Sequence, residues 1–466
     1  LRRHPGVDEV SADIRNPGAA PFQAEQDTWS AGPGPAVTLT VCWHPADGAA
    51  RKTRIGVHEV WWADVNERYS LAKQFRFWLW GLAIWAHPGK PGSSRPIARR
   101  HWLPSVAGSS ALYGRVRLFL SSAFFALLGI ALGPIGFIAK RLLGMRTPDV
   151  LRVLTNYLSA VKLYVQRRRF GPGLWWSRDE FLDSMGEPPR VSIRRRMVRG
   201  IADVACAGYQ RWYVLAHSQG TVVAFNGLMA DSYQWPGYLD EQRWERLLER
   251  GLGGPAVPGA TPPAPPIEPP PPAWTRGAIA YRRRIFERFR GFLSYGSPLE
   301  KFASIWTDLV PISREAVFTG DPPWINLYDP IDPVSGRLAA FAGHPAECCP
   351  APRNFGYCAS WWLLLAHLKY LTGRSGKRDA ASATAHWLLT DRIDSFPGTA
   401  GWSAGDWFAE RSTQFWVRSA LAWLMWIAAA AFIALVGAVV LPMVIQALLA
   451  TCRALRDAAT HLILGH

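Results

Sequence analysis

Short apolar runs, each closed by turn-forming residues, recur through the middle of the chain. Residues 213–216 form the first run, and residues 292–299 and 324–328 form two more. Continuous apolar runs of this length are typical of strands that are buried on both faces of a parallel sheet. A segment of small and apolar residues, 220–225, follows the first run and predicts a helix. The pattern therefore predicts an α/β fold with a mostly parallel sheet.

Two segments nearer the N-terminus also have the pattern of strands. Residues 37–43 alternate between apolar and polar side chains, and residues 56–65 contain a second strand-like run. We expect both to be early strands of the same sheet as the later runs. Residues 1–36 are polar and rich in Pro, Gly and Ala, so little order is expected there.

Two long stretches without charge have a different pattern. Residues 118–139 and 419–450 contain no Asp, Glu, Lys or Arg, and as helices each would exceed the roughly 30 Å hydrocarbon core of a bilayer. Gly and Pro residues near 133–136 favour a first stretch that folds back rather than crossing fully. Residues 75–86 are aromatic and apolar but shorter, which favours an interfacial helix. Added transmembrane helices are therefore expected.

These patterns divide the chain into segments. They are a poorly ordered N-terminal segment (1–36), early strands of the sheet (37–74), a membrane-associated insertion (75–142), a core (143–372) with a Pro-rich spacer (251–273), a polar linker (373–418), and a C-terminal transmembrane helix with its tail (419–466). The spacer is expected to be disordered or in polyproline conformation. The basic run Arg194-Arg195-Arg196 is expected on a solvated face or against anionic headgroups.

The turn after the first apolar run carries the clearest candidate chemistry. It reads Ala216-His217-Ser218-Gln219-Gly220, and a serine between small residues at a strand-to-helix turn is the pattern of a nucleophile elbow. Ala216 stands where glycine is usual, which is a mild departure because only a small side chain is needed. Gly220 is expected to let the helix pack closely on its strand. The backbone N–H of Gln219, at the head of the helix, is the candidate donor to an oxyanion.

Candidate partners for Ser218 follow downstream. The loop after residue 328 holds two carboxylates, Asp329 and Asp332, and His367 lies inside an apolar helical stretch. A serine hydroxyl becomes an effective nucleophile when an imidazole takes its proton, and the imidazole needs a carboxylate to fix its tautomer. The alternative for His367 is a histidine buried in the core. Asp332 is the preferred carboxylate, and Asp329 is the alternative acid.

Four motifs together resemble those of the α/β-hydrolase superfamily, in particular membrane-associated lipases and esterases. They are 216–221 for the elbow, 295–299 for the next strand end, 329–334 for the acid loop, and 366–370 for the histidine segment. The resemblance covers roughly residues 200–372 and implies a doubly wound, α/β-hydrolase-like sheet. It implies Ser218 as nucleophile, Asp332 as orienting acid and His367 as base, with no cofactor and no metal.

Composition adds the expected surroundings. The chain of 466 residues holds 52 basic and 35 acidic residues and 24 Trp, which favours a membrane surface as partner. Nucleic acid is disfavoured as a partner because zinc, helix-turn-helix and RNA-recognition signatures are missing from the sequence. The six cysteines lack metal-ligand spacing and are expected to be reduced. We expect a bacterial-type inner membrane, with the hydrolase domain facing the cytoplasm.

The function expected from these features is hydrolysis of an ester or thioester of a lipid-like, amphiphilic acyl substrate. Acyl transfer to an alcohol is left open, as is a non-catalytic membrane scaffold that retains the fold. One part of the machinery is missing from the sequence pattern, because acyl transfer normally uses two oxyanion donors. Trp43-His44-Pro45 is the nearest upstream candidate for the second donor, and it is a poor one. The oligomeric state is not encoded in any of these motifs.

Overall fold

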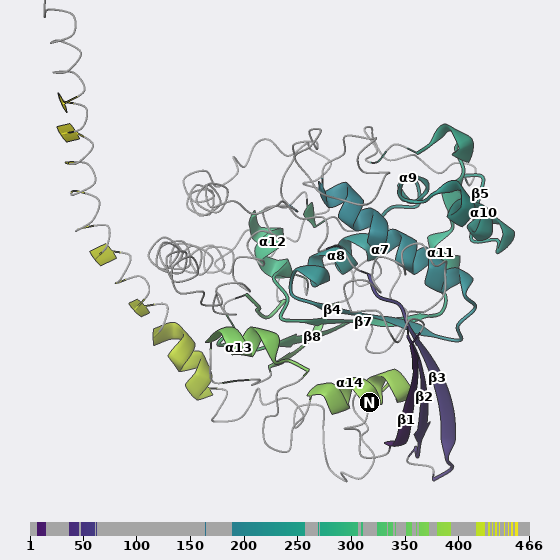
Figure 1. Cartoon of the computed structure of the whole chain (residues 1–466), viewed down its shortest axis with the longest axis horizontal. Coiled ribbons are helices and arrows are strands. Elements are labelled where there is room, and N and C mark those ends of the chain that lie inside the picture. The colour runs from purple at the N-terminus through teal and green to yellow at the C-terminus, as the bar shows by residue number, and fades with distance from the viewer. Residues whose placement is uncertain are drawn as a thin grey trace, which may run out of the picture.

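The computed structural model places about half of the chain (Figure 1). It describes residues 7–14, 37–45, 48–60, 62, 164, 189–256, 269, 271–305, 309–310, 324–332, 334–338, 341, 351–356, 360, 363–371, 380–392, 416–424 and scattered positions between 427 and 454. The predicted insertion at 75–142, with its apolar span 118–139, lies outside these residues.

The centre of the described molecule is a parallel sheet. Its strands are β4 (Trp212–His217), β7 (Phe289–Tyr295), β8 (Trp324–Tyr328) and β9 (Arg353–Gly356), hydrogen-bonded in the order β4-β7-β8-β9 and all parallel. The predicted strands over 213–216 and 324–328 are confirmed. The predicted strand over 292–299 is also confirmed as β7, although it begins three residues earlier than expected and ends at Tyr295. The predicted α/β class with a mostly parallel sheet is therefore correct.

Helices cover both faces of this sheet (Figure 1). Adjacent residues of a strand point to opposite faces, and here both faces are apolar. Phe292 and Trp324 pack in one cluster with α7 (Pro189–Cys206) and α8 (Gln219–Leu228). Leu293 and Ile325 pack in a second cluster on the other face, which includes Trp387 of α14 (Ala380–Thr390). The continuous apolar runs of the sequence thus result from burial on two sides.

The predicted linker over 373–418 is wrong for its middle part. Ala380, Ala383 and Trp387 lie on one side of α14, at helical spacing, and are all at least 98% buried. They cover the second face of the sheet. Alanine, serine and threonine dominate this helix, so the sequence has little of the hydrophobic contrast that marks an amphipathic helix.

The N-terminal strands form a sheet of their own within the described residues. β1 (Val7–Ile14), β2 (Val37–Trp43) and β3 (Arg51–Val57) pair antiparallel in the order β1-β2-β3. The prediction that the early strands belong to the main sheet is therefore wrong. Only residues 44–50 connect β2 to β3, and a connection this short permits an antiparallel neighbour but not a parallel one, which needs a crossover of a dozen or more residues.

The bounds of these strands correct two further predictions. β2 spans residues 37–43, as predicted. The second strand ends at Val57 rather than extending over 56–65. The prediction of little order over 1–36 is wrong for residues 7–14, which form β1. This strand is ordered because its backbone hydrogen-bonds to β2 along its length. Leu389 of α14 packs against Val41 and Trp43, which joins this sheet to the rest of the core.

The ends of the Pro-rich spacer are ordered. Gly253–Gly254 (β5) pairs antiparallel with Ile279–Ala280 (β6), and Ala273–Thr275 (η2) forms a short 3₁₀ turn. The prediction of disorder or polyproline structure is therefore wrong at the start of the spacer, whereas Pro272, with φ −62° and ψ 151°, has the polyproline backbone conformation. Most of the remainder of 251–273 lies outside the described residues. The other short helices are α9 (Trp235–Tyr238), α10 (Glu241–Glu249), α11 (Arg282–Ile285), α12 (Leu299–Ile305) and α13 (Leu363–Leu368).

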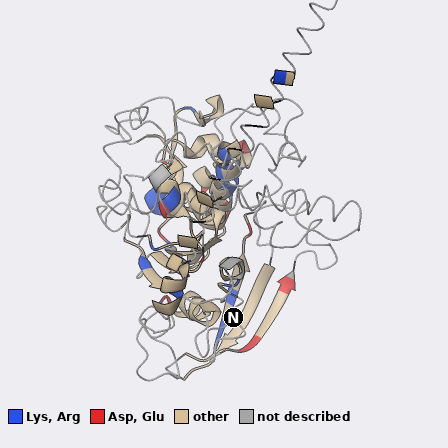
Figure 2. Ribbon diagram, turned by 90° about the vertical axis from the view of Figure 1, so that its left-hand side faces the viewer, with Lys and Arg blue, Asp and Glu red and all other residues tan. Residues whose placement is uncertain are grey.

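The basic residues are distributed over several helices and strands (Figure 2). Arg195 and Arg196 of α7 are only 0% and 3% exposed. The expectation of a solvated or headgroup-facing run is therefore wrong for these two residues. Arg194 donates a hydrogen bond to the Tyr238 hydroxyl at 3.2 Å, so the run contributes to packing between α7 and α9.

Residues 416–424 are helical and begin the apolar C-terminal stretch. Among the residues that the structure describes, no helix combines the length and the apolar character needed to cross a bilayer. Half of 419–450 and all of 118–139 lie outside the described residues. Trp416, Trp423 and Leu424 are each more than half exposed.

Candidate active site

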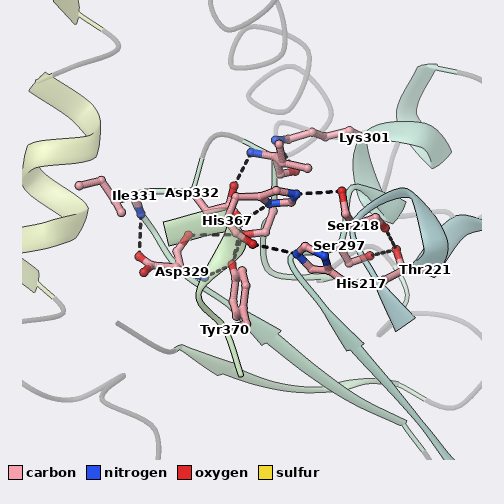
Figure 3. Close-up of polar contacts among 12 residues, drawn as sticks. His217, Ser218, Thr221, Ser297, Lys301, Asp329, Ile331, Asp332, His367 and Tyr370 are labelled. Carbon is pink, nitrogen blue, oxygen red and sulfur yellow. Dashed lines mark hydrogen bonds and ion pairs between the residues drawn. The ribbon is translucent and has the colours of Figure 1, made fainter. Parts of the chain in front are cut away.

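Ser218 lies in a sharp turn between β4 and α8 (Figure 3). Its backbone has φ 55° and ψ −132°, a positive φ that L residues rarely adopt. The turn is held by a hydrogen bond from the Ser218 N–H to the Tyr295 carbonyl at 3.0 Å. The hydroxyl makes no capping bond to α8, so it is directed away from the helix it precedes. A strained residue at such a turn is typical of functional sites.

Neighbouring hydroxyls brace this turn. Thr221 donates a side-chain hydrogen bond to the Ser218 carbonyl at 2.7 Å, and its Oγ1 lies 2.7 Å from the Ser297 Oγ (Figure 3). Ser297 in turn accepts the Leu299 N–H at the start of α12. The turn after β4 and the turn after β7 are thereby joined at one edge of the sheet.

Gly220 does not have the role that the sequence predicts for it. A Cβ added there would meet no described atom within 4 Å. The close approach is at Gly227, where an added Cβ would come within 2.4 Å of Met197 Cγ on α7. The small residue that the helix packing requires is therefore two turns further along α8, between two helices.

His367 of α13 reaches the serine. Its Nε2 lies 2.8 Å from Ser218 Oγ, and its side chain is largely buried. The imidazole is brought there because α13 follows β9, at the same edge of the sheet as the turn after β4 (Figure 1). With the proton on Nδ1, the Ser218 hydroxyl donates to Nε2, which is the geometry of a general base beside its nucleophile.

Asp332 lies on the other side of the imidazole. Its Oδ2 is 2.9 Å from His367 Nδ1, its Oδ1 accepts the Val334 N–H at 2.8 Å, and the Tyr370 hydroxyl donates to Oδ2 at 2.9 Å. Burial opposes ionisation of this carboxyl, but attraction to His367 and these hydrogen bonds hold its pKa well below the usual range. Asp332 is therefore an ionised carboxylate that fixes the proton on Nδ1.

Asp329, the alternative acid, has a different partner. Its Oδ2 accepts a hydrogen bond from Arg418 Nη2 at 2.6 Å, and its Oδ1 accepts the Ile331 N–H at 3.1 Å. Both members of this ion pair are almost fully buried. The structure therefore brings Ser218, His367 and Asp332 together, whereas Asp329 forms an ion pair with Arg418 of the helical residues 416–424.

Tyr370 connects the two carboxylates. Its hydroxyl accepts the Asp329 N–H at 2.8 Å, donates to Asp332, and lies 2.8 Å from Ser335 Oγ. Burial and the charges of both carboxylates raise the Tyr370 pKa well above its usual value, so the phenol remains a donor. The sequence motif placed Tyr370 in the histidine segment but gave it no role.

His217 and Gly296 were missed by the sequence analysis, although His217 lies inside the elbow motif. His217 Nε2 donates to the His367 carbonyl at 2.8 Å, and the ring stacks on Tyr295. Gly296 has φ +61°, and a Cβ there would lie 3.1 Å from atoms of His217, His367 and Tyr370. The glycine is therefore needed both for its backbone conformation and for the space that three rings occupy.

Replacement of Gly296 by alanine is expected to destabilise the fold by about 1–3 kcal/mol, because of the positive φ. It should also lower kcat by about tenfold to a hundredfold, because the added methyl displaces the His367 ring. Thermal unfolding and ester hydrolysis test the two effects. Gly208→Ala is the matched control, since Gly208 has φ +74° with no described atom within 4 Å of its added Cβ. Equal kcat losses in both variants would contradict the steric explanation.

His217 gives the fold an acid-sensitive element. Burial, together with the neighbouring His367, lowers the His217 pKa from 6.5 to about 4. Above pH 6.5 the ring is neutral in both the folded and the unfolded chain and contributes no pH dependence. Between pH 6.5 and 4 only the unfolded chain takes up the proton, so stability falls, by on the order of 3 kcal/mol at the lower limit.

The variant His217→Gln retains an amide donor toward the His367 carbonyl but does not titrate. Its unfolding midpoint is expected to decline less than that of the native chain between pH 6.5 and 4. Thermal unfolding in a detergent solution at half-unit pH steps measures the difference. Parallel declines in the two proteins would show that His217 is not the titrating group.

Gln219 carries the backbone N–H that the sequence predicts as the oxyanion donor. It is the first residue of α8, and the first N–H groups of a helix have no acceptor within the helix. The residue is 3% exposed, and neither atom of its buried side-chain amide has a hydrogen-bond partner among the described residues. His44, the poor upstream candidate, pairs with Asp8 of β1 at 2.8 Å in the N-terminal sheet. Among the residues that the structure describes, no group of three or more His, Cys, Asp or Glu side chains is placed to hold a metal ion.

The arrangement of Ser218, His367 and Asp332 is a chain of hydrogen bonds along which a serine proton can be withdrawn. Comparisons with protein-family models, with curated proteins and with solved structures found no match for this chain.

Proposed function

We propose that this protein is a membrane-bound serine hydrolase with an α/β-hydrolase-like fold that cleaves ester or thioester bonds. The observation that carries the proposal is the chain Ser218 Oγ to His367 Nε2 at 2.8 Å and His367 Nδ1 to Asp332 Oδ2 at 2.9 Å. The three residues follow the ends of β4, β8 and β9 in the order Ser, Asp, His. This is the chain order of the α/β-hydrolase triad.

The proposed reaction has two halves. In the first, Ser218 Oγ attacks the acyl carbon while its proton moves to His367 Nε2, and the resulting oxyanion accepts the Gln219 N–H. The tetrahedral species collapses to an acyl-serine, and Nε2 gives its proton to the departing alcohol or thiol. In the second half, water adds to the acyl-serine with His367 as base. Collapse releases the carboxylic acid and returns the proton to Ser218.

Support for a lipid-like substrate and a membrane location comes from the sequence and from the C-terminal segment. The uncharged stretches at 118–139 and 419–450 have the length of membrane segments. Trp416, Trp423 and Leu424 expose apolar surface at the start of the second stretch. Indole rings are common at membrane interfaces. An amphiphilic acyl ester supplied from the bilayer fits these surroundings.

The strained backbone of Ser218 favours the enzyme over a non-catalytic scaffold. A positive φ at a non-glycine residue destabilises a fold by about 1–3 kcal/mol, and a scaffold would gain nothing from keeping it. A buried carboxylate aligned on the far side of the imidazole is likewise needed for proton transfer and not for packing.

A fluorophosphonate probe applied to membranes that contain the full chain tests the proposal. The native protein is expected to be labelled stoichiometrically, and labelling should be lost in Ser218→Ala and His367→Ala. Ser192→Ala is the control, because it removes a buried hydroxyl from α7 instead. If the native protein unfolds cooperatively but is not labelled, the hydrolase proposal is wrong and the scaffold alternative is favoured.

A further inference from the structure

Two fully buried carboxylates lie three residues apart in one loop. Asp329 and Asp332 both have 0% exposure, and the Asp332 N–H donates to the Asp329 carbonyl at 3.0 Å. Buried anions are unfavourable unless each has a cation or strong donors, and like charges repel at short range. The loop therefore needs two separate sources of compensation if both carboxylates are to remain ionised.

The compensation comes from two different parts of the chain. His367 and the Tyr370 hydroxyl bind Asp332, whereas Arg418 binds Asp329 from the helical residues 416–424. Arg418 also donates to the Ser360 carbonyl, and it is 1% exposed. In Figure 3 the Asp329 side chain points away from His367, toward the C-terminal helix.

The position of Asp329 is transmitted to Asp332 by two short routes. One is the backbone hydrogen bond within the loop, and the other is Tyr370, which accepts the Asp329 N–H and donates to Asp332. A shift of Asp329 would move the donor that holds the Asp332 oxygen facing the imidazole. A displacement of about 1 Å at such a group is enough to lower a catalytic rate by roughly a hundredfold.

We propose that Arg418 is a positioning residue that determines which carboxylate serves His367. By holding Asp329 in a separate ion pair, Arg418 keeps Asp332 alone on the imidazole and fixes the loop that presents it. The C-terminal segment is thereby part of the active site as well as the predicted membrane anchor. This inference rests on the proposed hydrolase function.

The test uses the full chain in detergent micelles and a long-chain p-nitrophenyl ester. Arg418→Met is expected to lower kcat by about tenfold to a hundredfold while KM changes by less than about threefold, since loop geometry and not substrate binding is lost. Arg418→Lys, which keeps the cation, should retain most of the rate. Val417→Met is the matched control, because Val417 is its exposed neighbour on the same helix.

The neutral pair Arg418→Met with Asp329→Asn tests whether the unpaired Asp329 carboxylate, and not the loss of the Arg418 side chain by itself, causes the loss of kcat. Removing both charges abolishes the buried imbalance, so the double variant is expected to recover kcat to within about threefold of the native value. Recovery of kcat in the double variant supports the inference, and it does so even if Arg418→Met alone fails to fold. The inference is overturned if folded Arg418→Met has native kcat, or if the folded double variant is as slow as Arg418→Met. Absence of fluorophosphonate labelling in the native protein would instead overturn the proposed function.

Discussion

Replacing Ser218 by alanine, His367 by alanine, or both together is expected to lower kcat by nearly the same factor, on the order of 10⁶. The hydroxyl and the imidazole act as one unit, because the serine is a weak nucleophile until Nε2, 2.8 Å away, takes its proton. Without the imidazole the serine is not activated, and without the serine the imidazole has no nucleophile to deprotonate, so a second substitution adds little further loss. The remaining activity would come from the oxyanion donor and from substrate binding alone.

Steady-state hydrolysis of one ester by the native protein, the two single variants and the double variant measures this coupling. His386→Gln serves as the control for the His367 substitution. His386 is a buried histidine of α14, the helix that covers the face of the sheet formed by Leu293 and Ile325. Its kcat should stay within about threefold of the native value. Losses that multiply in the double variant would mean that Ser218 and His367 act independently, and would remove the basis of the proposed mechanism.

The parts of the fold that could be predicted from the sequence are those whose signal is local. β8 is a continuous apolar run because both of its faces are covered. The apolar strand before Ser218 also contributes to both clusters, although its Leu215 is 40% exposed. The turn at Ser218 is visible in the sequence because the serine stands between an apolar run and a segment of small and apolar residues. β2 was correctly bounded because one-sided burial imposes strict alternation.

The features that could not be predicted depend on contacts between distant segments. β1 acquires order from pairing with β2, and α14 acquires its role from the face of the sheet that it covers. The motif gave two carboxylates in one loop with a preference for Asp332. The local sequence could not show that Arg418, near the far end of the chain, binds Asp329. A single arginine beside an apolar stretch carries no sequence pattern from which its ion-pair partner could be predicted.

The exchange Asp332→Asn is expected to lower kcat by about 10⁴-fold at neutral pH with the fold retained. The Val334 N–H fixes the orientation of the new amide, because it requires an acceptor at the former Oδ1 position. The amide nitrogen must then take the former Oδ2 position and donate to His367 Nδ1, because the backbone N–H cannot turn away whereas the Tyr370 hydroxyl can turn its proton from that position to Ser335 Oγ, 2.8 Å away. This selects the tautomer that carries its proton on Nε2, where it faces Ser218 and cannot accept the serine proton.

Asp329→Asn provides the contrast that makes this prediction specific. It removes an equally buried carboxylate from the same loop, yet His367 keeps its partner, so kcat should fall only by about tenfold, through disturbance of the loop. The two variants are compared by kcat at pH 7.5, with thermal unfolding as the check that both are folded. Because Asp329→Asn leaves the buried Arg418 without its carboxylate, it is expected to be the less stable of the two. A larger kcat loss in Asp329→Asn than in Asp332→Asn would reverse the assignment of the acid, since tautomer control would then lie with Asp329.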